Sequence, residues 1–283
     1  MSTCWADIED ARRDVLAVVP RDEFLRSILK GVMRVARDKK NPIRGNMVAS
    51  ALRELVTYVL HTLAPEDEVR RCVWFEQAKD TKTVTRAQRA RYIVQAGLPD
   101  DFVRERLKVD AAALAKPLLS AMDALHKATH VRADTVVRKG GAVRQMLYEV
   151  LTEIHALIDD AAQSREAIKD AVATALHNAV FESLILETIQ ELDELSTHTR
   201  VDGHWIDTIS VKLLDATRIE YRVTGEVEVE LQYGSNSDVE NDIGMRSDDS
   251  YPYRAKVSAE AGKPLEIDAE AIRLHVDTSS FYE

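Results

Sequence analysis

Cysteine, glycine and proline are all scarce in this chain of 283 residues, and their scarcity narrows what it can be. Only two cysteines are present, Cys4 and Cys72, so we expect neither a disulfide framework nor a cysteine-based zinc site. We expect both thiols to be reduced and Cys72 to be packed. The 10 glycines form neither a GxxxxGK loop nor a GxGxxG loop, which excludes the two common phosphate-binding turns.

Long apolar runs are also missing. No stretch approaches the roughly 18 uninterrupted apolar residues of a membrane helix, and the charged first thirty residues lack a signal-peptide core. We therefore expect a cytoplasmic protein that does not enter a membrane. With 45% hydrophobic residues, the chain is long enough to bury the cores of two modest domains.

Residues 1–196 are predicted to be helical almost throughout. In residues 46–65 an apolar residue recurs at every fourth position until Pro65 ends the helix, and the recurring residues are Met47, Ala51, Leu55, Val59 and Leu63. A last long helix is predicted over residues 167–195, with an apolar seam of Ile168, Val172, Leu176, Val180, Leu184 and Leu192. These patterns predict a helical bundle.

The sequence changes character at about residue 197, where β-branched residues and turn signals replace the helical period. Strands are predicted over HWIDTISVKLL, TRIEYRV and EVEVELQY, with TGE as a tight turn and YGSNSDVENDIG as a polar loop. AKVSAE and AIRLHVD are candidates for edge strands. Helices followed by a run of strands predict the α+β class, here an N-terminal all-helical bundle (1–196) and a small, mostly antiparallel β-domain (197–283).

The net charge of -10 is unevenly distributed between these two parts. From Arg200 to the end there are 9 Lys and Arg against 18 Asp and Glu, whereas residues 1–199 hold 29 against 30. The β-domain is therefore acidic as a whole. A bare acidic module repels phosphate, so the charge balance favours the helical part as the nucleic-acid surface.

One acidic strand holds the candidate catalytic residues. In GEVEVELQY the side chains of Glu226, Glu228 and Glu230 share one face, because side chains alternate along a strand. Two interpretations remain open: a solvated face, or a site for Mg²⁺ or Mn²⁺ completed by Asp202, Asp207 or Asp238. Mg²⁺ usually takes one or two carboxylates from different elements, and the loop around Asp238 fails the EF-hand pattern.

Two helical segments hold the candidate nucleic-acid-binding residues. In TVTRAQRARYIVQAGL, Thr85 is a plausible helix cap, Arg86 and Arg89 share a face near Tyr92, and arginine suits bidentate contact with phosphate. LHKATHVRAD adds two more candidates, His130 and Arg132. For the first segment the competing interpretation is a solvated helix face. For the second, the alternatives are a zinc site of His126 and His130, which are four residues apart, and histidines that satisfy the last carbonyls of a helix.

Several of these segments together resemble a known family. WFEQAKDTKTVTRAQRARYIVQAGLPDDFV, LHKATHVRAD and VEVELQYGSNSDVENDIG with SYPYRAKV are similar to the bacterial predicted pPIWI-associating nucleases, over about residues 45–258. The resemblance implies a prokaryotic conflict-system protein, encoded near defence or mobile-element genes, to which nuclease activity is assigned by computational inference.

Two nuclease signatures that would support this activity are missing from the sequence. Restriction-like nucleases place an E-x-K pair beside a further acid, but the nearest lysine of the β-domain, Lys212, precedes the acidic strand by fourteen residues. HEPN ribonucleases use an R-x(4–6)-H pair, and none of the eight histidines has an arginine at that spacing. Arg200 and His204 come closest, with three residues between them.

The sequence therefore predicts a recognition or adaptor module of a defence system, which acts through the helical bundle and the acidic β-domain. A metal-dependent nuclease acting on phage or mobile-element nucleic acid is the alternative, with Mg²⁺ or Mn²⁺ as its cofactor. A regulatory ligand-binding module is a third interpretation. The predicted partners are a protein from the same defence operon, a nucleic acid bound by the helical domain, and a second copy of the chain.

Overall fold

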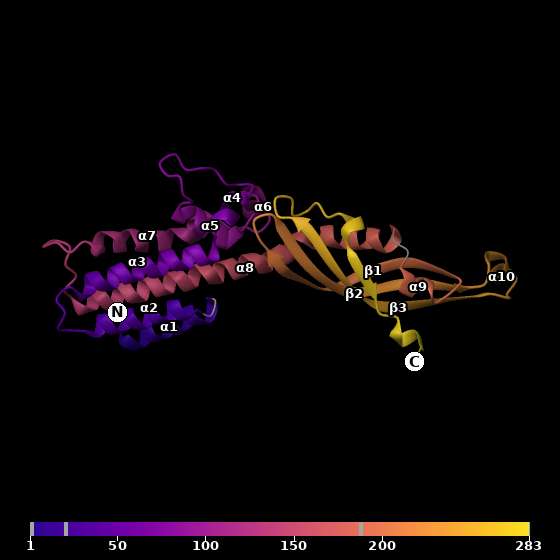
Figure 1. Cartoon of the computed structure of the whole chain (residues 1–283). Helices are drawn as coiled ribbons and strands as arrows, with labels where there is room; N and C mark the ends of the chain where they lie inside the picture. Colours follow the sequence, from indigo (N-terminus) through magenta and orange to yellow (C-terminus); the bar gives the residue numbers. More distant parts are fainter. Residues whose placement is uncertain (1–2, 20–21, 187–188, 283) are drawn as a thin grey trace. The chain divides into compact units, whose positions relative to one another are not determined.

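The computed structural model describes residues 3–19, 22–186 and 189–282 (Figure 1). Helices occupy the first two thirds of the chain and a four-stranded antiparallel sheet follows, which confirms the predicted α+β class. By spatial contacts the chain divides into two compact units, Met1–Ala96 with Asp100–Ser164, and Gly97–Pro99 with Arg165–Glu283. This division follows contacts, whereas the predicted boundary at residue 196 follows secondary structure.

Unit 1 is a helical bundle. Its helices are α1 (Trp5–Val18), α2 (Glu23–Arg37), α3 (Arg44–Leu63), α4 (Glu66–Arg71), α5 (Arg86–Gln95), α6 (Asp100–Glu105), α7 (Ala111–Thr129) and the first part of α8 (Gly140–Leu186). Helix α3 packs against α2, α5 and α7. Leu55 and Val59 of the predicted series are buried, together with Val48, Leu52, Val56 and Leu60 beside it, whereas Met47 is 43% exposed. The buried stripe is therefore broader than the every-fourth series, and Met47 lies outside it.

Helix α8 is much longer than predicted. It begins at Gly140 rather than near residue 167, because apolar residues at helical spacing, such as Leu147, Ile154 and Ala161, extend the buried seam toward the N-terminus. Part of the predicted range, residues 187–188, lies outside the described residues. A short helix, α9 (Gln190–Asp193), then buries Leu192. No described helix has the length and apolar character needed to cross a membrane.

Unit 2 is built around the sheet, whose strands are β1 (His198–Leu214), β2 (Arg218–Tyr233), β3 (Met245–Glu260) and β4 (Arg273–Val276), in that spatial order. Strand β2 runs unbroken through Thr224, Gly225 and Glu226, so the prediction of a TGE turn is wrong. A Cβ at position 225 would lie 2.0 Å from the carbonyl oxygen of Trp205. The glycine is therefore needed for the close approach of β1, and the turn lies at Asp215 instead, whose carboxylate accepts hydrogen bonds from two backbone N–H groups.

The sheet has one buried and one exposed face, as expected of an antiparallel sheet that packs on one side. Odd-numbered residues are buried from Ile219 to Leu231 in β2 and from Tyr251 to Ala259 in β3. Even-numbered residues of the same strands point to the opposite face, where they are exposed or half-buried except for Gln232, which is buried. We call this second face the outer face of the sheet.

Strand β1 pairs with β2 irregularly. The register shifts at three points, and the residue skipped at each shift is charged and exposed: Asp202, Asp207 and Lys212. The connection between β2 and β3, predicted as a polar loop, instead contains the short helix α10 (Asn236–Glu240). Two 3₁₀ helices, η1 (Ala269–Ala271) and η2 (Ser279–Tyr282), flank β4 in the sequence.

Candidate functional site

The acidic end of the outer face contains the three glutamates of β2. Glu230 lies opposite Arg200 of β1 and Asp248 of β3. Its Oε1 atom is 3.9 Å from a guanidinium nitrogen of Arg200 and 3.8 Å from one of Arg246. Glu230 is therefore neutralised by arginines of its own sheet.

Glu226 and Glu228 have different neighbours. Glu228 lies opposite Gly203 and Ser250, and Glu226 lies opposite Trp205 and Pro252. A Cβ at position 203 would lie 3.3 Å from Oε2 of Glu228, so this carboxylate lies beside the glycine backbone of β1. Over the described ranges, no group of three or more His, Cys, Asp or Glu side chains is arranged to hold a metal ion.

Asp238 closes the first turn of helix α10. Its carboxylate accepts hydrogen bonds from the backbone N–H and the hydroxyl of Ser235, both at 2.7 Å, while Ser235 Oγ accepts from the backbone N–H of Asp238 at 3.2 Å. The hydrogen bond from the Ser235 hydroxyl and then that from its N–H hold the pKa of Asp238 below its usual value. This capping box explains the position of Asp238 without a metal.

Two of the three candidates on helix α5 are buried. Thr85 caps the helix through Gln88, and Arg86 is exposed, but Arg89 is only 3% exposed and Tyr92 is also buried. The guanidinium of Arg89 donates to the carbonyl of Ala64 and to Glu66 Oε2, the latter at 3.2 Å. Burial lowers the pKa of Arg89.

These contacts give Arg89 and Tyr92 a different role from the predicted one. Ala64 is the C-terminal cap of helix α3, where backbone carbonyls lack partners within the helix. Arg89 satisfies one of these carbonyls and so fastens α5 to the end of α3. Of the three α5 candidates, Arg86 alone is exposed to a ligand.

His130 and Arg132 are exposed and follow helix α7. The imidazole rings of His126 and His130 meet edge to face, with centroids 5.7 Å apart. The segment is held by Asn46, which is buried and donates to the carbonyls of Ala128 and Thr135 at 2.8 and 3.0 Å. Sequence reasoning missed Asn46, although an asparagine within an apolar helix stripe is a signal of a buried polar contact.

Sequence reasoning also missed a group of cations on the outer face, beyond the acidic end. Arg222 of β2 lies opposite Lys256 of β3, which lies opposite Arg273 of β4, and Arg254 is two residues before Lys256. All four side chains are exposed. We call Arg222, Arg254, Lys256 and Arg273 the basic cluster. Along β2 the outer face thus carries Glu226, Glu228 and Glu230 in one part and Arg222 of the basic cluster in another, with the Arg218–Glu220 ion pair beyond the cluster.

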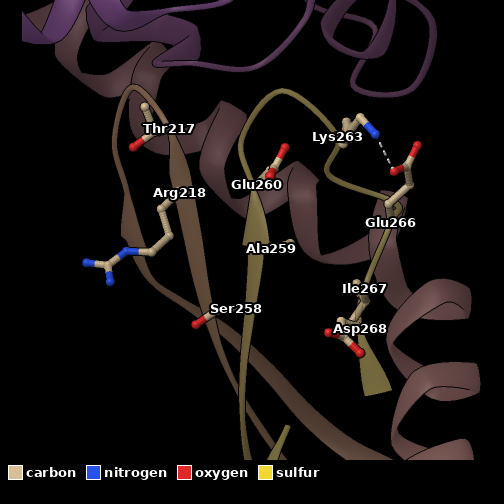
Figure 2. Close-up of a pocket in the computed structure, with 9 residues that line it drawn as sticks. All are labelled: Thr217, Arg218, Ser258, Ala259, Glu260, Lys263, Glu266, Ile267 and Asp268. Carbon is tan, nitrogen blue, oxygen red and sulfur yellow. Dashed lines mark hydrogen bonds and ion pairs between the residues drawn. The ribbon is translucent and has the colours of Figure 1, made fainter. Parts of the chain in front are cut away.

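Two hollows adjoin this face. The larger, about 610 Å³, lies beside the turn between β1 and β2 and is shown in Figure 2, where Lys263 and Glu266 face each other and Arg218 extends away from them. Lys263 Nζ lies 2.7 Å from Glu266, and Arg218 lies 3.1 Å from Glu220, so these charges are already paired. The smaller hollow, about 300 Å³, is lined by Asp207, Thr224, Gly225, Pro252, Tyr253, Arg254, His275 and Asp277.

A polar cluster lies within the core of unit 2. His204 Nε2 is 3.0 Å from the carbonyl of His177, and because a carbonyl only accepts, Nε2 carries the proton. The other ring nitrogen then accepts from the Tyr253 hydroxyl at 2.9 Å, and the His204 ring stacks on His177 at 4.2 Å. Burial first, and then the neighbouring His177, lower the pKa of His204. A neutral His204 therefore belongs to the core packing.

Comparison with known proteins gives the same family for both parts of the chain. Residues 17–154 match one family model and residues 161–282 match another, and each model is described as "Predicted pPIWI-associating nuclease". The gap between the matches falls within helix α8, close to the division between the units at Ser164. Searches of the curated proteins and of the solved structures each returned no match. The two family matches cover nearly the whole chain, which therefore belongs to the predicted pPIWI-associating nucleases.

Proposed function

We propose that this protein is a recognition subunit of a prokaryotic defence or conflict system, which docks a partner protein on the acidic end of its outer sheet face. The observation that supports this role most strongly is that two of the candidate catalytic acids already have partners within the fold. Glu230 is paired with Arg200 and Arg246, and Asp238 closes a helical turn. Both carboxylates thus have structural partners within unit 2.

Glu226 and Glu228 are the acids left for a partner. In the part of the chain that the structure describes, neither makes an ion pair, and they lie about 7 Å apart on one face of one strand. Like charges at this spacing repel, and a cationic partner surface relieves the repulsion. The family description links these proteins to pPIWI proteins. We therefore propose a cytoplasmic PIWI-type protein, encoded in the same operon, as the partner that supplies lysine and arginine side chains.

A metal-dependent nuclease is the second candidate, favoured because acids and exposed cations share the outer face. These carboxylates fit a metal ion poorly, because the glutamates lie in a row along one strand and Asp238 accepts hydrogen bonds from Ser235. A site for Mg²⁺ or Mn²⁺ would require Glu226 or Glu228 together with Asp202 or Asp207 of β1.

A cleavage assay tests the choice between the two candidates. The purified protein and Glu228→Gln are incubated with labelled single- and double-stranded DNA and RNA, in Mg²⁺, in Mn²⁺ and in EDTA. The recognition role predicts no metal-dependent cleavage by either protein. Cleavage that needs metal and disappears in Glu228→Gln, with the melting temperature unchanged, would make the acidic strand an active site and end the proposal.

A binding assay tests the docking surface directly. The double variant Glu226→Lys and Glu228→Lys is expected to bind the PIWI-type protein at least about tenfold more weakly, because attraction becomes repulsion. The matched control reverses two exposed acids of helices α7 and α8, Asp123→Lys and Asp170→Lys, and is expected to bind like the wild type. Equal affinities of the two double variants would remove the acidic end from the interface.

A further inference from the structure

The basic cluster has no role in the docking function proposed above. It lies on the outer face of a part of the chain with twice as many acids as cations, so its composition is unlike that of its surroundings. We propose that Arg222, Arg254, Lys256 and Arg273 bind the sugar-phosphate backbone of a single-stranded nucleic acid laid across strands β2, β3 and β4.

The first argument is the electrostatic repulsion between the cations of the cluster. Arg222, Lys256 and Arg273 occupy directly opposite positions on three neighbouring strands, and neighbouring strands are about 4.8 Å apart. Like charges placed directly opposite each other destabilise a sheet. A polyanion bound across this row would turn the repulsion into attraction at several points at once.

The second argument is that the fold does not neutralise these cations. Three other arginines with side chains on the sheet surface, Arg200, Arg218 and Arg246, each form an ion pair with an acid of the sheet. In the described part of the chain, no member of the basic cluster forms one. Asp277 is an acid at the edge of the cluster, where it lines the smaller hollow together with Arg254. Hydrogen bonds from Ser279, followed by smaller effects of His275 and Arg254, hold the pKa of Asp277 down.

The third argument is the surface around the cluster, which favours single strands. One guanidinium group can bind two oxygens of a phosphate at once, and three of the four cations are arginines. The smaller hollow, with Arg254 and His275 in its lining, offers space beside the row for a base. Trp205 of β1 is 40% exposed on the same sheet face and offers a ring on which a base can stack. Unpaired bases reach both features, whereas the bases of a duplex are stacked inside it.

This inference goes beyond the proposed function and does not depend on it. Protein docking is assigned to Glu226 and Glu228, and nucleic-acid binding to the basic cluster; the two sites adjoin at Trp205, which lies opposite Glu226. Either can fail alone, since the variants that test them share no residue.

The experiment measures fluorescence anisotropy of labelled single-stranded RNA, single-stranded DNA and duplex DNA with the full chain over a range of salt concentrations. The triple variant Arg222→Gln, Lys256→Gln and Arg273→Gln is expected to lose at least about thirtyfold in affinity for single strands. Its slope of log K against log salt should be shallower by about 2, because each phosphate contact to a single strand contributes about 0.7.

The matched control neutralises three exposed cations on helices, Lys30→Gln, Lys116→Gln and Arg165→Gln, and should leave affinity and slope near those of the wild type. Trp205→Ala should weaken single-strand binding about tenfold with the slope unchanged, which separates stacking from charge. Melting curves verify that every variant is folded.

Three outcomes would overturn the proposal: no binding of any single strand by the wild type at low salt, equal slopes for the triple variant and the wild type, or tighter binding of a polyglutamate peptide than of the single strands. The last result would assign the cluster to an acidic protein segment instead.

Discussion

Arg89 in the helical unit and Arg222 on the sheet carry the same side chain in opposite situations. Arg89 is 3% exposed and gives its hydrogen bonds to Ala64 and Glu66, both from its own unit. Arg222 is exposed and stands beside Lys256 rather than an acid. In the sequence Arg89 is prominent because it lies in a motif, whereas Arg222 is inconspicuous because most charged residues of its strand are acidic.

The difference teaches that a charged motif and an available charge are separate properties. In the helical unit the motif TRAQR builds the fold, since Thr85 caps a helix and Arg89 fastens that helix to its neighbour. On the sheet the available cations come from three separate strands, and only Arg254 and Lys256 share one segment, SYPYRAKV. They come together because three strands align. Three predictions test whether groups with contacts inside the fold contribute more to stability than exposed groups of the same kind.

The largest expected effect is that of Arg89→Ala. Removing the guanidinium leaves the Ala64 carbonyl without this donor, breaks the ion pair with Glu66 and empties buried space, so the free energy of unfolding should fall by about 3 kcal/mol. Part of the loss is offset because Arg89 Nε is buried without a partner in the described structure. Urea unfolding gives the value, with exposed Arg86→Ala as the control, expected within about 0.5 kcal/mol of the wild type. Equal losses of stability in the two variants would show that buried Arg89 contributes no more to the fold than exposed Arg86.

A smaller loss is expected from Gly225→Ala. The new methyl group would meet the Trp205 carbonyl at 2.0 Å and the Tyr253 hydroxyl at 2.8 Å, so β1 has to move and the free energy of unfolding should fall by about 2 kcal/mol. Gly31→Ala, in the middle of helix α2, is the control, because apart from its chain neighbours and the backbone of its own helix no atom lies within 4 Å of the new methyl group. This control should be about 0.5–1 kcal/mol more stable than the wild type. An unchanged free energy of unfolding in Gly225→Ala would show that the strand tolerates a side chain at this position.

The smallest expected effect is a pH dependence that comes from His204. Its pKa is lowered in the folded protein, so below the ordinary histidine pKa of about 6.5 the unfolded chain binds more protons than the folded one. The stability contributed by neutral His204 is complete above that pH and decreases as the pH falls through it. His204→Gln should therefore lose less stability than the wild type between pH 7.5 and 5.5, measured by urea unfolding. His198→Gln removes an exposed imidazole and is the control; parallel curves for wild type and His204→Gln would refute the prediction.

Local patterns were enough to predict the class of the fold and most of its elements. The apolar period marks the helices, and the alternation of GEVEVELQY correctly separates a buried from an outward-pointing face. The TGE turn was wrong because glycine is compatible both with a turn and with the close approach of two strands. Only the position of Trp205 on the neighbouring strand distinguishes these cases.

The basic cluster could not be predicted from the sequence because it depends on pairing register. Arg222, Lys256 and Arg273 are separated by 34 and 17 positions in the chain, and a shift of one residue in either pairing would place one of them on the buried face. The burial of Arg89 was equally out of reach, since it depends on where helix α3 ends. Contacts between distant segments, rather than residue type, decided both.

The irregular pairing of β1 also has a consequence for how the protein behaves at high concentration. A long, regular strand at the edge of a sheet is a template on which another chain can add, and β1 is the first strand of the order and 17 residues long. Asp202, Asp207 and Lys212 interrupt its register at every fifth residue. No regular segment of this edge is longer than four residues, and each is bounded by an exposed charge. The same irregularities that bend β1 thus protect the sheet from aggregation through its longest open edge.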